Sequence, residues 1–214
     1  MLWVLFFQIV GVVICPTADM HPRIDAGDIS YVSDILKLLF PQAPVQIINA
    51  GISGDNTENG LKRIQQDVLR FHPDLTVVCF GLNDSVWGLE KVAEYGRNLK
   101  KIFLKLQENG SEIIYMTPNM MNTYVSWRLK ESRLIETAEI TQKIQNEGIF
   151  KAFLDEGKRV AQECGVTICD VYQKWELLYA NGVDTTELLA NYINHPNRDM
   201  NWLFAYSLVE TMMQ

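Results

Sequence analysis

Three short polar segments contain residues whose types and spacing could do chemistry. Residues 49–57 (NAGISGDNT) hold two glycines, which permit a tight turn and leave backbone N–H groups exposed for an anion or oxyanion. Residues 81–85 (GLNDS) contain Asn83, and a side-chain amide can donate to a developing oxyanion. Residues 191–197 (NYINHPN) contain His195, whose imidazole titrates near neutrality as a general base must. Together they could supply an oxyanion site and a base.

Each segment taken alone also has an ordinary structural explanation. The glycines of the first could simply form a turn in which Asp55 or Thr57 caps the next helix. An Asn-Asp pair after a strand is typical of a turn, and a single loop histidine is more often a surface residue. The first segment also lacks the lysine and the GxxxxGK[ST] spacing of a phosphate loop, so nucleotide binding is not indicated.

The surrounding elements predict an α/β fold. Apolar runs without polar alternation are typical of strands covered on both faces, and they occupy residues 45–50, 75–80, 111–117 and 166–171, with a further strand in the first fifteen residues. Helical periodicity is found at residues 31–40, 57–71, 92–109, about 132–162, and 201–212.

This alternation predicts one domain over residues 1–214, a three-layer α/β/α sandwich with a five-stranded, parallel, doubly wound sheet of flavodoxin-like type. In such sheets ligands bind at the carboxyl ends of the strands. The first two polar segments directly follow predicted strands, so we expect them to lie at that edge together with the segment around His195.

Composition and charge disfavour several classes of function. The formal net charge is −7, and the lysines and arginines are scattered among acidic residues, so nucleic acid is not an expected partner. The four cysteines form no CxxC pair and the three histidines lie far apart in the sequence. We therefore expect no metal site and no cofactor.

The first fifteen residues (MLWVLFFQIVGVVIC) are almost wholly apolar. A membrane span takes about 18 or more such residues, and a secretory signal begins with positive charge, which is missing here. We interpret the segment as a buried first strand, with a signal or a misassigned start as alternatives. We expect a cytoplasmic protein without a stable membrane span, although the apolar start leaves secretion open. The oligomeric state is not indicated.

In combination, the three segments resemble blocks of the SGNH (GDSL-like) lipase and esterase superfamily. These blocks are a strand followed by NAGISGDNT, a strand followed by GLND, and a C-terminal HPN. The resemblance runs from about Tyr31 to the C-terminus. It implies hydrolysis of an ester or thioester by acyl transfer through a serine, without metal or organic cofactor. It also implies that Gly54 and Asn83 are the oxyanion donors and His195 the catalytic base.

The first block of that superfamily, a Gly-Asp-Ser at the end of the first strand, has no counterpart here. Counting back from the next helix, the serine should fall within residues 13–17, which read VICPT. The weak candidates for the nucleophile are Cys15, Thr17 and Ser53, the last in a near match to the GxSxG elbow. The Gly-Asp-Ile-Ser at residues 27–30 is regarded as chance. We expect little or no ester turnover from the chain as written.

The carboxylate that partners the histidine in that superfamily is also missing. Three residues before His195, where the resemblance places an acid, the chain has Tyr192. Without a carboxylate the imidazole loses the group that fixes its tautomer and stabilises its charged form. Asn191, Asp184 or a backbone carbonyl could orient the ring instead.

Three functions therefore remain open. The first is an ester hydrolase, impaired by its unidentified nucleophile, that acts on a small-molecule ester such as an acyl lipid or an acylated sugar. The second is a catalytically inactive SGNH-like domain that binds an acylated or glycan ligand, and the third is an unrelated small-molecule-binding α/β protein. An aperiodic segment with Met120, Met121, Tyr124 and Trp127 could form an apolar lid or acyl wall, or could be ordinary packing.

Overall fold

The computed structural model describes residues 2–7, 27–43 and 45–214, and its strands form one parallel sheet. The strands are β1 (Leu2–Phe7), β2 (Val45–Asn49), β3 (Leu75–Val78), β4 (Glu112–Met116) and β5 (Thr167–Cys169). Their order across the sheet is β2-β1-β3-β4-β5. The predicted α/β class with a parallel sheet is confirmed.

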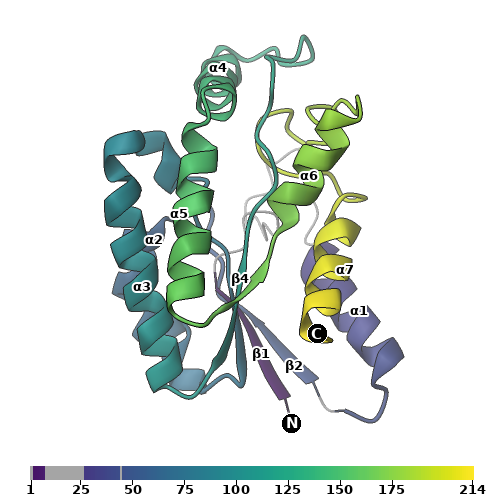
Figure 1. Cartoon of the computed structure of the whole chain (residues 1–214). Coiled ribbons are helices and arrows are strands. Elements are labelled where there is room, and N and C mark those ends of the chain that lie inside the picture. The colour runs from purple at the N-terminus through teal and green to yellow at the C-terminus, as the bar shows by residue number, and fades with distance from the viewer. Residues whose placement is uncertain (1, 8–26, 44) are drawn as a thin grey trace.

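Helices connect the strands and cover the sheet. The α-helices are α1 (Gly27–Leu39), α2 (Thr57–Asp67), α3 (Val92–Glu108), α4 (Ser132–Asn146), α5 (Ile149–Glu163), α6 (Val171–Ala180) and α7 (Asn201–Met212). Short 3₁₀ helices occupy Leu69–Phe71, Asp84–Trp87 and Leu89–Lys91. Figure 1 shows α2, α3 and α5 on one side of the strands, with α1 and α7 on the other.

The core consists of one large apolar cluster on each side of the sheet. Val77 of β3 belongs to the cluster that includes Leu208 of α7, whereas the next residue, Val78, belongs to the cluster that includes Phe103 of α3 and Phe153 of α5. Because side chains alternate between the two faces of a strand, a strand buried on both faces is apolar at most positions. In β3 the exception is the buried Thr76, whose hydroxyl is 2.8 Å from that of Ser111. Burial on both faces explains why the strands appear in the sequence as largely apolar runs.

Two sequence predictions about the helices are wrong in detail. The single helix predicted over residues 132–162 is two helices, because Gly148 adopts a left-handed backbone with φ of +75° and starts α5 in a new direction. Helix α6 was not predicted, although Asp170 caps it by accepting from the Gln173 N–H at 3.1 Å. The predicted first strand is described only over Leu2–Phe7, and residues 8–15 lie outside the described residues.

Two buried tyrosines support the backbone at the end of β3. The Tyr95 hydroxyl donates to the Phe80 carbonyl at 3.1 Å, and the hydroxyls of Tyr95 and Tyr115 are 2.9 Å apart. Burial raises the pKa of both hydroxyls above the ordinary tyrosine value, so both stay protonated at neutral pH. Gly157 of α5 lies against this pair: a Cβ there would collide with the Tyr115 hydroxyl and come within 3.0 Å of the Tyr95 hydroxyl.

Gly157→Ala should lower the free energy of unfolding by about 1–3 kcal/mol, the usual cost of an extra methyl group in a well-packed core. The penalty should shrink in a Tyr115→Phe background, because that change removes the hydroxyl with which the new Cβ collides. Urea unfolding of the two single variants and the double variant measures this coupling. Equal penalties in both backgrounds would contradict the contact.

Candidate active site

The turn after β2 presents Gly54 at an exposed corner. The Asp55 N–H donates to the Ile52 carbonyl at 3.2 Å, which closes a turn, and Gly54 adopts a φ of +74° that favours glycine. Arg63 of α2 holds both ends of this turn: its Nε is 2.6 Å from the Asp55 carboxylate and its Nη1 donates to the Ala50 carbonyl at 2.6 Å. The Gly54 corner is therefore a fixed part of the structure at the carboxyl end of β2.

The helix that follows this turn is capped by Asn56, whose side chain accepts from the Asn59 N–H at 3.0 Å. The sequence suggested Asp55 or Thr57 for this role, but Asp55 is ion-paired with Arg63. Thr57 instead bonds to a partner 27 residues away in the chain. Both side chains suggested as caps are therefore used in tertiary contacts.

That partner is Asp84, a 2% exposed carboxylate beside Asn83. Its Oδ1 accepts from the Thr57 N–H at 3.0 Å and from the Thr57 hydroxyl at 2.6 Å, and its Oδ2 accepts from the Gly81 N–H at 3.2 Å. Burial raises the pKa of Asp84 above its ordinary value, and the bonds from Thr57 and Gly81 oppose that shift. The carboxylate thus ties the start of α2 to the turn that carries Asn83.

Asn83 reaches across to the Gly54 turn. Its Nδ2 donates to the backbone carbonyl of Asp55, the residue after Gly54, at 2.8 Å. A side-chain amide has two N–H hydrogens, and this bond occupies one of them. The structure therefore brings Gly54 and Asn83 together, as the positions of their strands in the sequence predicted.

His195 lies in a compact loop with an internal bridge between Leu189 and Pro196. The Asn191 side chain organises the loop, because its Oδ1 accepts from the N–H groups of residues 193, 194 and 195 at 3.0–3.1 Å. The loop is anchored beside the end of β4, where the Asn119 amide donates to the Asn194 carbonyl at 2.9 Å. Since β4 is the neighbour of β3, the loop sits on the same edge of the sheet as Asn83.

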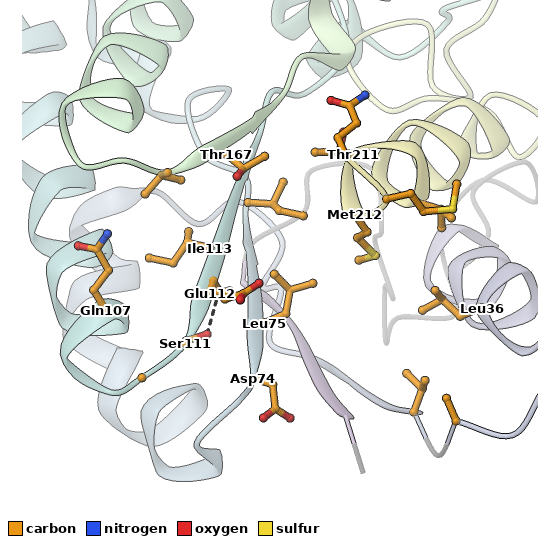
Figure 2. A pocket seen from close by; sticks show the side chains of 18 of the residues that line it. Leu36, Asp74, Leu75, Gln107, Ser111, Glu112, Ile113, Thr167, Thr211 and Met212 are labelled. Carbon is orange, nitrogen blue, oxygen red and sulfur yellow. Dashed lines mark hydrogen bonds between the residues drawn. The ribbon is translucent and has the colours of Figure 1, made fainter. Parts of the chain in front are cut away.

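A cavity of about 930 Å³ lies at the opposite, amino-terminal edge, where Leu75, Glu112 and Thr167 begin β3, β4 and β5 (Figure 2). None of the three candidate residues lines it. Ligands of parallel sheets bind at the carboxyl ends of the strands, so we assign the chemistry to the Asn83 edge despite the size of this cavity.

Within the described residues, no helix is long and apolar enough to cross a membrane. No group of three or more His, Cys, Asp or Glu residues in the same part of the chain is arranged to hold a metal ion.

Comparison with known proteins identifies the family. A model of the GDSL-like lipase/acylhydrolase family matches residues 18–203, most of the chain. The chain belongs to this family. The third function left open by the sequence, an unrelated α/β protein, is thereby excluded.

Two similar proteins are named as esterases. An acetylxylan esterase from Geobacillus stearothermophilus is 30% identical over 102 residues, covering 43% of this chain and 46% of its own length. An arylesterase from Vibrio mimicus is 37% identical over 73 residues, covering 34% of this chain and 36% of its own. The alignments therefore span less than half of either relative.

A crystal structure of a catalytic mutant of the Geobacillus stearothermophilus acetylxylan esterase, with a serine changed to alanine, matches with a TM-score of 0.73 at 19% identity. The match covers 98% of this chain and 93% of that one. Another catalytic mutant of the same enzyme replaces an aspartate. At this identity the likeness shows the shared GDSL-type fold alone.

The residues suggested as nucleophile are only partly described. Cys15 and Thr17 lie outside the described residues, and β1 ends at Phe7. Ser53 is exposed in the Gly54 turn, and the non-glycine residues with positive φ in the described chain are His72 and Tyr192. Ser53 therefore lacks the strained backbone of a nucleophile elbow. The nucleophile stays unassigned.

The groups suggested to orient His195 are occupied elsewhere. Tyr192, at the family's acid position, belongs to a small apolar cluster with Leu129. The Asp184 carboxylate accepts from the Tyr124 hydroxyl at 2.8 Å and from the Glu187 N–H at 3.3 Å. Asn191 accepts from backbone N–H groups, as described above.

The two methionines of the segment suggested as a lid are packed in the core. Met120 and Met121 are 4% and 0% exposed and belong to the main core, so they form no acyl wall at the surface. Trp127 is 70% exposed, with the Arg128 guanidinium 4.8 Å from its ring. Tyr124 is half-buried, and its hydroxyl donates to the Asp184 carboxylate at 2.8 Å.

His195 is half-buried as a residue. Its Nδ1 atom, however, is closed off from solvent and has no hydrogen-bond partner among the described residues. Burial lowers the pKa of His195 to about 4, because the charged form loses its hydration. The imidazole is therefore neutral at pH 7.

The buried imidazole predicts a particular pH dependence. As pH falls from about 6.5 to about 4, the unfolded chain binds a proton at His195 that the folded chain does not, so the free energy of unfolding decreases. The parent chain should lose on the order of 1–3 kcal/mol of its free energy of unfolding across this pH window because of His195. The His195→Gln variant should not show that loss. Urea unfolding at several pH values measures the difference, and an NMR titration midpoint of His195 near 6.5 would contradict the buried ring.

Proposed function

We propose that this chain is an ester hydrolase that works by acyl transfer, with Gly54 and Asn83 as oxyanion donors and His195 as the base. The observation that carries the proposal is the bond from Asn83 Nδ2 to the Asp55 carbonyl at 2.8 Å. It holds an amide donor beside the backbone of the Gly54 corner, on a sheet edge that also holds the His195 loop. Family membership supports the same chemistry.

The electrostatics of this site suit a developing negative charge. The donors are neutral N–H groups held in place by the Asp84 and Arg63 contacts, so they need little rearrangement when the oxyanion forms. One such donor typically stabilises the transition state by about 2.7–4 kcal/mol. The ester carbonyl would place its oxygen between Gly54 N and the second N–H of Asn83.

His195 fits the role of base, but its low pKa limits its basicity. It is neutral at pH 7 and can accept a proton from an attacking hydroxyl or thiol, yet its pKa of about 4 makes it a weak base. The weak base, together with the lack of a serine at residues 13–17 where the resemblance places the nucleophile, predicts slow turnover. A missing nucleophile typically costs on the order of a millionfold in kcat.

The substrate we propose is a small acyl ester of a sugar or an aryl alcohol, in line with the acetylxylan esterase and arylesterase relatives. The alternative is an acyl lipid. Hydrolysis of acetylated xylo-oligosaccharide and 4-nitrophenyl acetate, but not of a long-chain nitrophenyl ester, would support the short acyl group.

The test is hydrolysis of 4-nitrophenyl acetate over long incubations. We expect slow turnover that is abolished by His195→Ala and reduced roughly a hundredfold by Asn83→Ala, because that variant loses one oxyanion donor. Asn181→Ala is the matched control, since this exposed asparagine bonds only locally to the Leu177 carbonyl. Equal rates for the parent and the Asn83 variant would remove Asn83 from the mechanism.

The nucleophile can be identified by assaying three further variants beside the parent: Cys15→Ala, Thr17→Ala and Ser53→Ala. The variant that loses as much activity as His195→Ala has lost the nucleophile. Rapid hydrolysis by the parent would refute the proposal that the site is impaired. Absence of any His195-dependent turnover, with binding of an acylated sugar retained, would favour the inactive, ligand-binding alternative.

A further inference from the structure

Two unpaired polar atoms lie beside the peptide bond that leads into His195. Among the described residues, the buried atoms without a hydrogen-bond partner include His195 Nδ1 and Asn119 Oδ1. Asn119 follows β4 and is 0% exposed, and its Nδ2 donates to the Asn194 carbonyl at 2.9 Å. That carbonyl belongs to the same peptide unit as the His195 nitrogen. The carboxamide of Asn119 therefore lies directly against the histidine's backbone.

The surrounding bonds fix which end of the Asn119 amide is the oxygen. Its nitrogen donates to two carbonyl oxygens, Met120 O at 2.7 Å and Asn194 O at 2.9 Å. Carbonyl oxygens only accept, so the atom facing them must be the NH₂ group. The remaining atom is a buried acceptor without a donor among the described residues, which is unfavourable unless a donor reaches it.

The neutral imidazole carries one such donor, because one of its two nitrogens holds a proton. The two side chains that the sequence suggested for it are committed: Asn191 Oδ1 to three backbone N–H groups, and Asp184 to Tyr124. Burial is the one cause that shifts the pKa of His195, so no charged group of the described chain acts on the ring.

We infer that Asn119 is the positioning residue of His195: in the working site Asn119 Oδ1 accepts a hydrogen bond from His195 Nδ1–H. The two atoms are not bonded in this structure, and rotation of the imidazole side chain is the change that would join them. The inference rests on the proposed role of His195 as base. It assigns to Asn119 the orienting function that Tyr192 cannot perform.

This contact has a defined chemical consequence. With its proton held on Nδ1, the ring presents the Nε2 lone pair to the nucleophile, as acyl transfer requires. An amide oxygen is neutral, so it fixes the tautomer without stabilising the imidazolium as a carboxylate would. Histidine paired with asparagine is a known arrangement in cysteine proteases, so the pairing is compatible with catalysis.

Three other buried oxygens, Asn109 Oδ1, Thr185 Oγ1 and Asn201 Oδ1, are also without partners among the described residues. No hydrogen bond within that part of the chain joins any of these side chains to residues 190–195, whereas Asn119 is bonded there. Asn119 is accordingly the better-placed acceptor.

The test reads the tautomer of the His195 ring in the resting protein by long-range ¹H–¹⁵N NMR at pH 7, with His195→Gln to assign its signals. We expect the proton on Nδ1 in the parent chain and loss of that preference in Asn119→Leu. Asn119→Ala, which removes the same acceptor with a smaller side chain, should lose that preference as well.

Asn122→Ala is the matched control. Asn122 is equally buried, and its backbone N–H, which the variant keeps, donates to the Ile193 carbonyl at 2.8 Å. Its side-chain Oδ1 already accepts from the Thr141 hydroxyl at 2.6 Å. This variant removes a buried carboxamide beside the same loop and should leave the His195 tautomer unchanged. Should both Asn119 variants fail to fold, the tautomer of the parent chain decides the question.

A proton on Nε2 in the parent chain, or a proton that stays on Nδ1 in Asn119→Leu or Asn119→Ala, would overturn the inference. In the turnover assay Asn119→Leu should lower kcat at least tenfold and leave KM unchanged. The two proposals fail separately: the predicted tautomer without any ester hydrolysis refutes the enzyme activity alone, and His195-dependent hydrolysis with the wrong tautomer refutes the role of Asn119 alone.

Discussion

The buried carboxylate of Asp84 is the constraint on which the site depends. It accepts two bonds from Thr57 and one from Gly81, and so joins the first turn of α2 to the turn of Asn83. A carboxylate is stabilised near a helix N-terminus, and its three donors offset the cost of leaving water. Losing it would leave the Thr57 and Gly81 donors buried and unsatisfied. The Gly54 corner and Asn83 are therefore held as one unit.

The rest of the edge is built on the same principle of one polar group serving two segments. Arg63 bonds to both ends of the Gly54 turn, and Asn119 bonds the His195 loop to the end of β4. The bonds of Arg63 are charge-assisted, and such bonds are shorter and stronger than neutral ones, which suits positions that must not move. If Gly54 and Asn83 act as oxyanion donors, as proposed, these supports hold them in place before the charge develops.

Most of the sheet could be predicted from the sequence because strands buried on both faces are continuous apolar runs, as at Val77 and Val78. The break at Gly148 could not, since a glycine inside a helical pattern is often tolerated and its φ of +75° depends on tertiary packing. The candidates Gly54 and Asn83 were predicted from turns that follow strands, and His195 from a polar segment before the last helix. Asp84 and Asn119 were missed as supports, because their partners are 27 and 75 residues away and no local pattern signals such contacts.

The central claim is that Gly54 and Asn83 share one oxyanion between them at the carboxyl edge, beside His195. The most direct measurement is a crystal structure of the protein with acetate, the expected product of a short acyl ester. The account predicts one carboxylate oxygen within about 3 Å of both Gly54 N and Asn83 Nδ2, with the other side of the ion facing His195. Acetate bound elsewhere, or bound at this edge without contact to either donor, would contradict it.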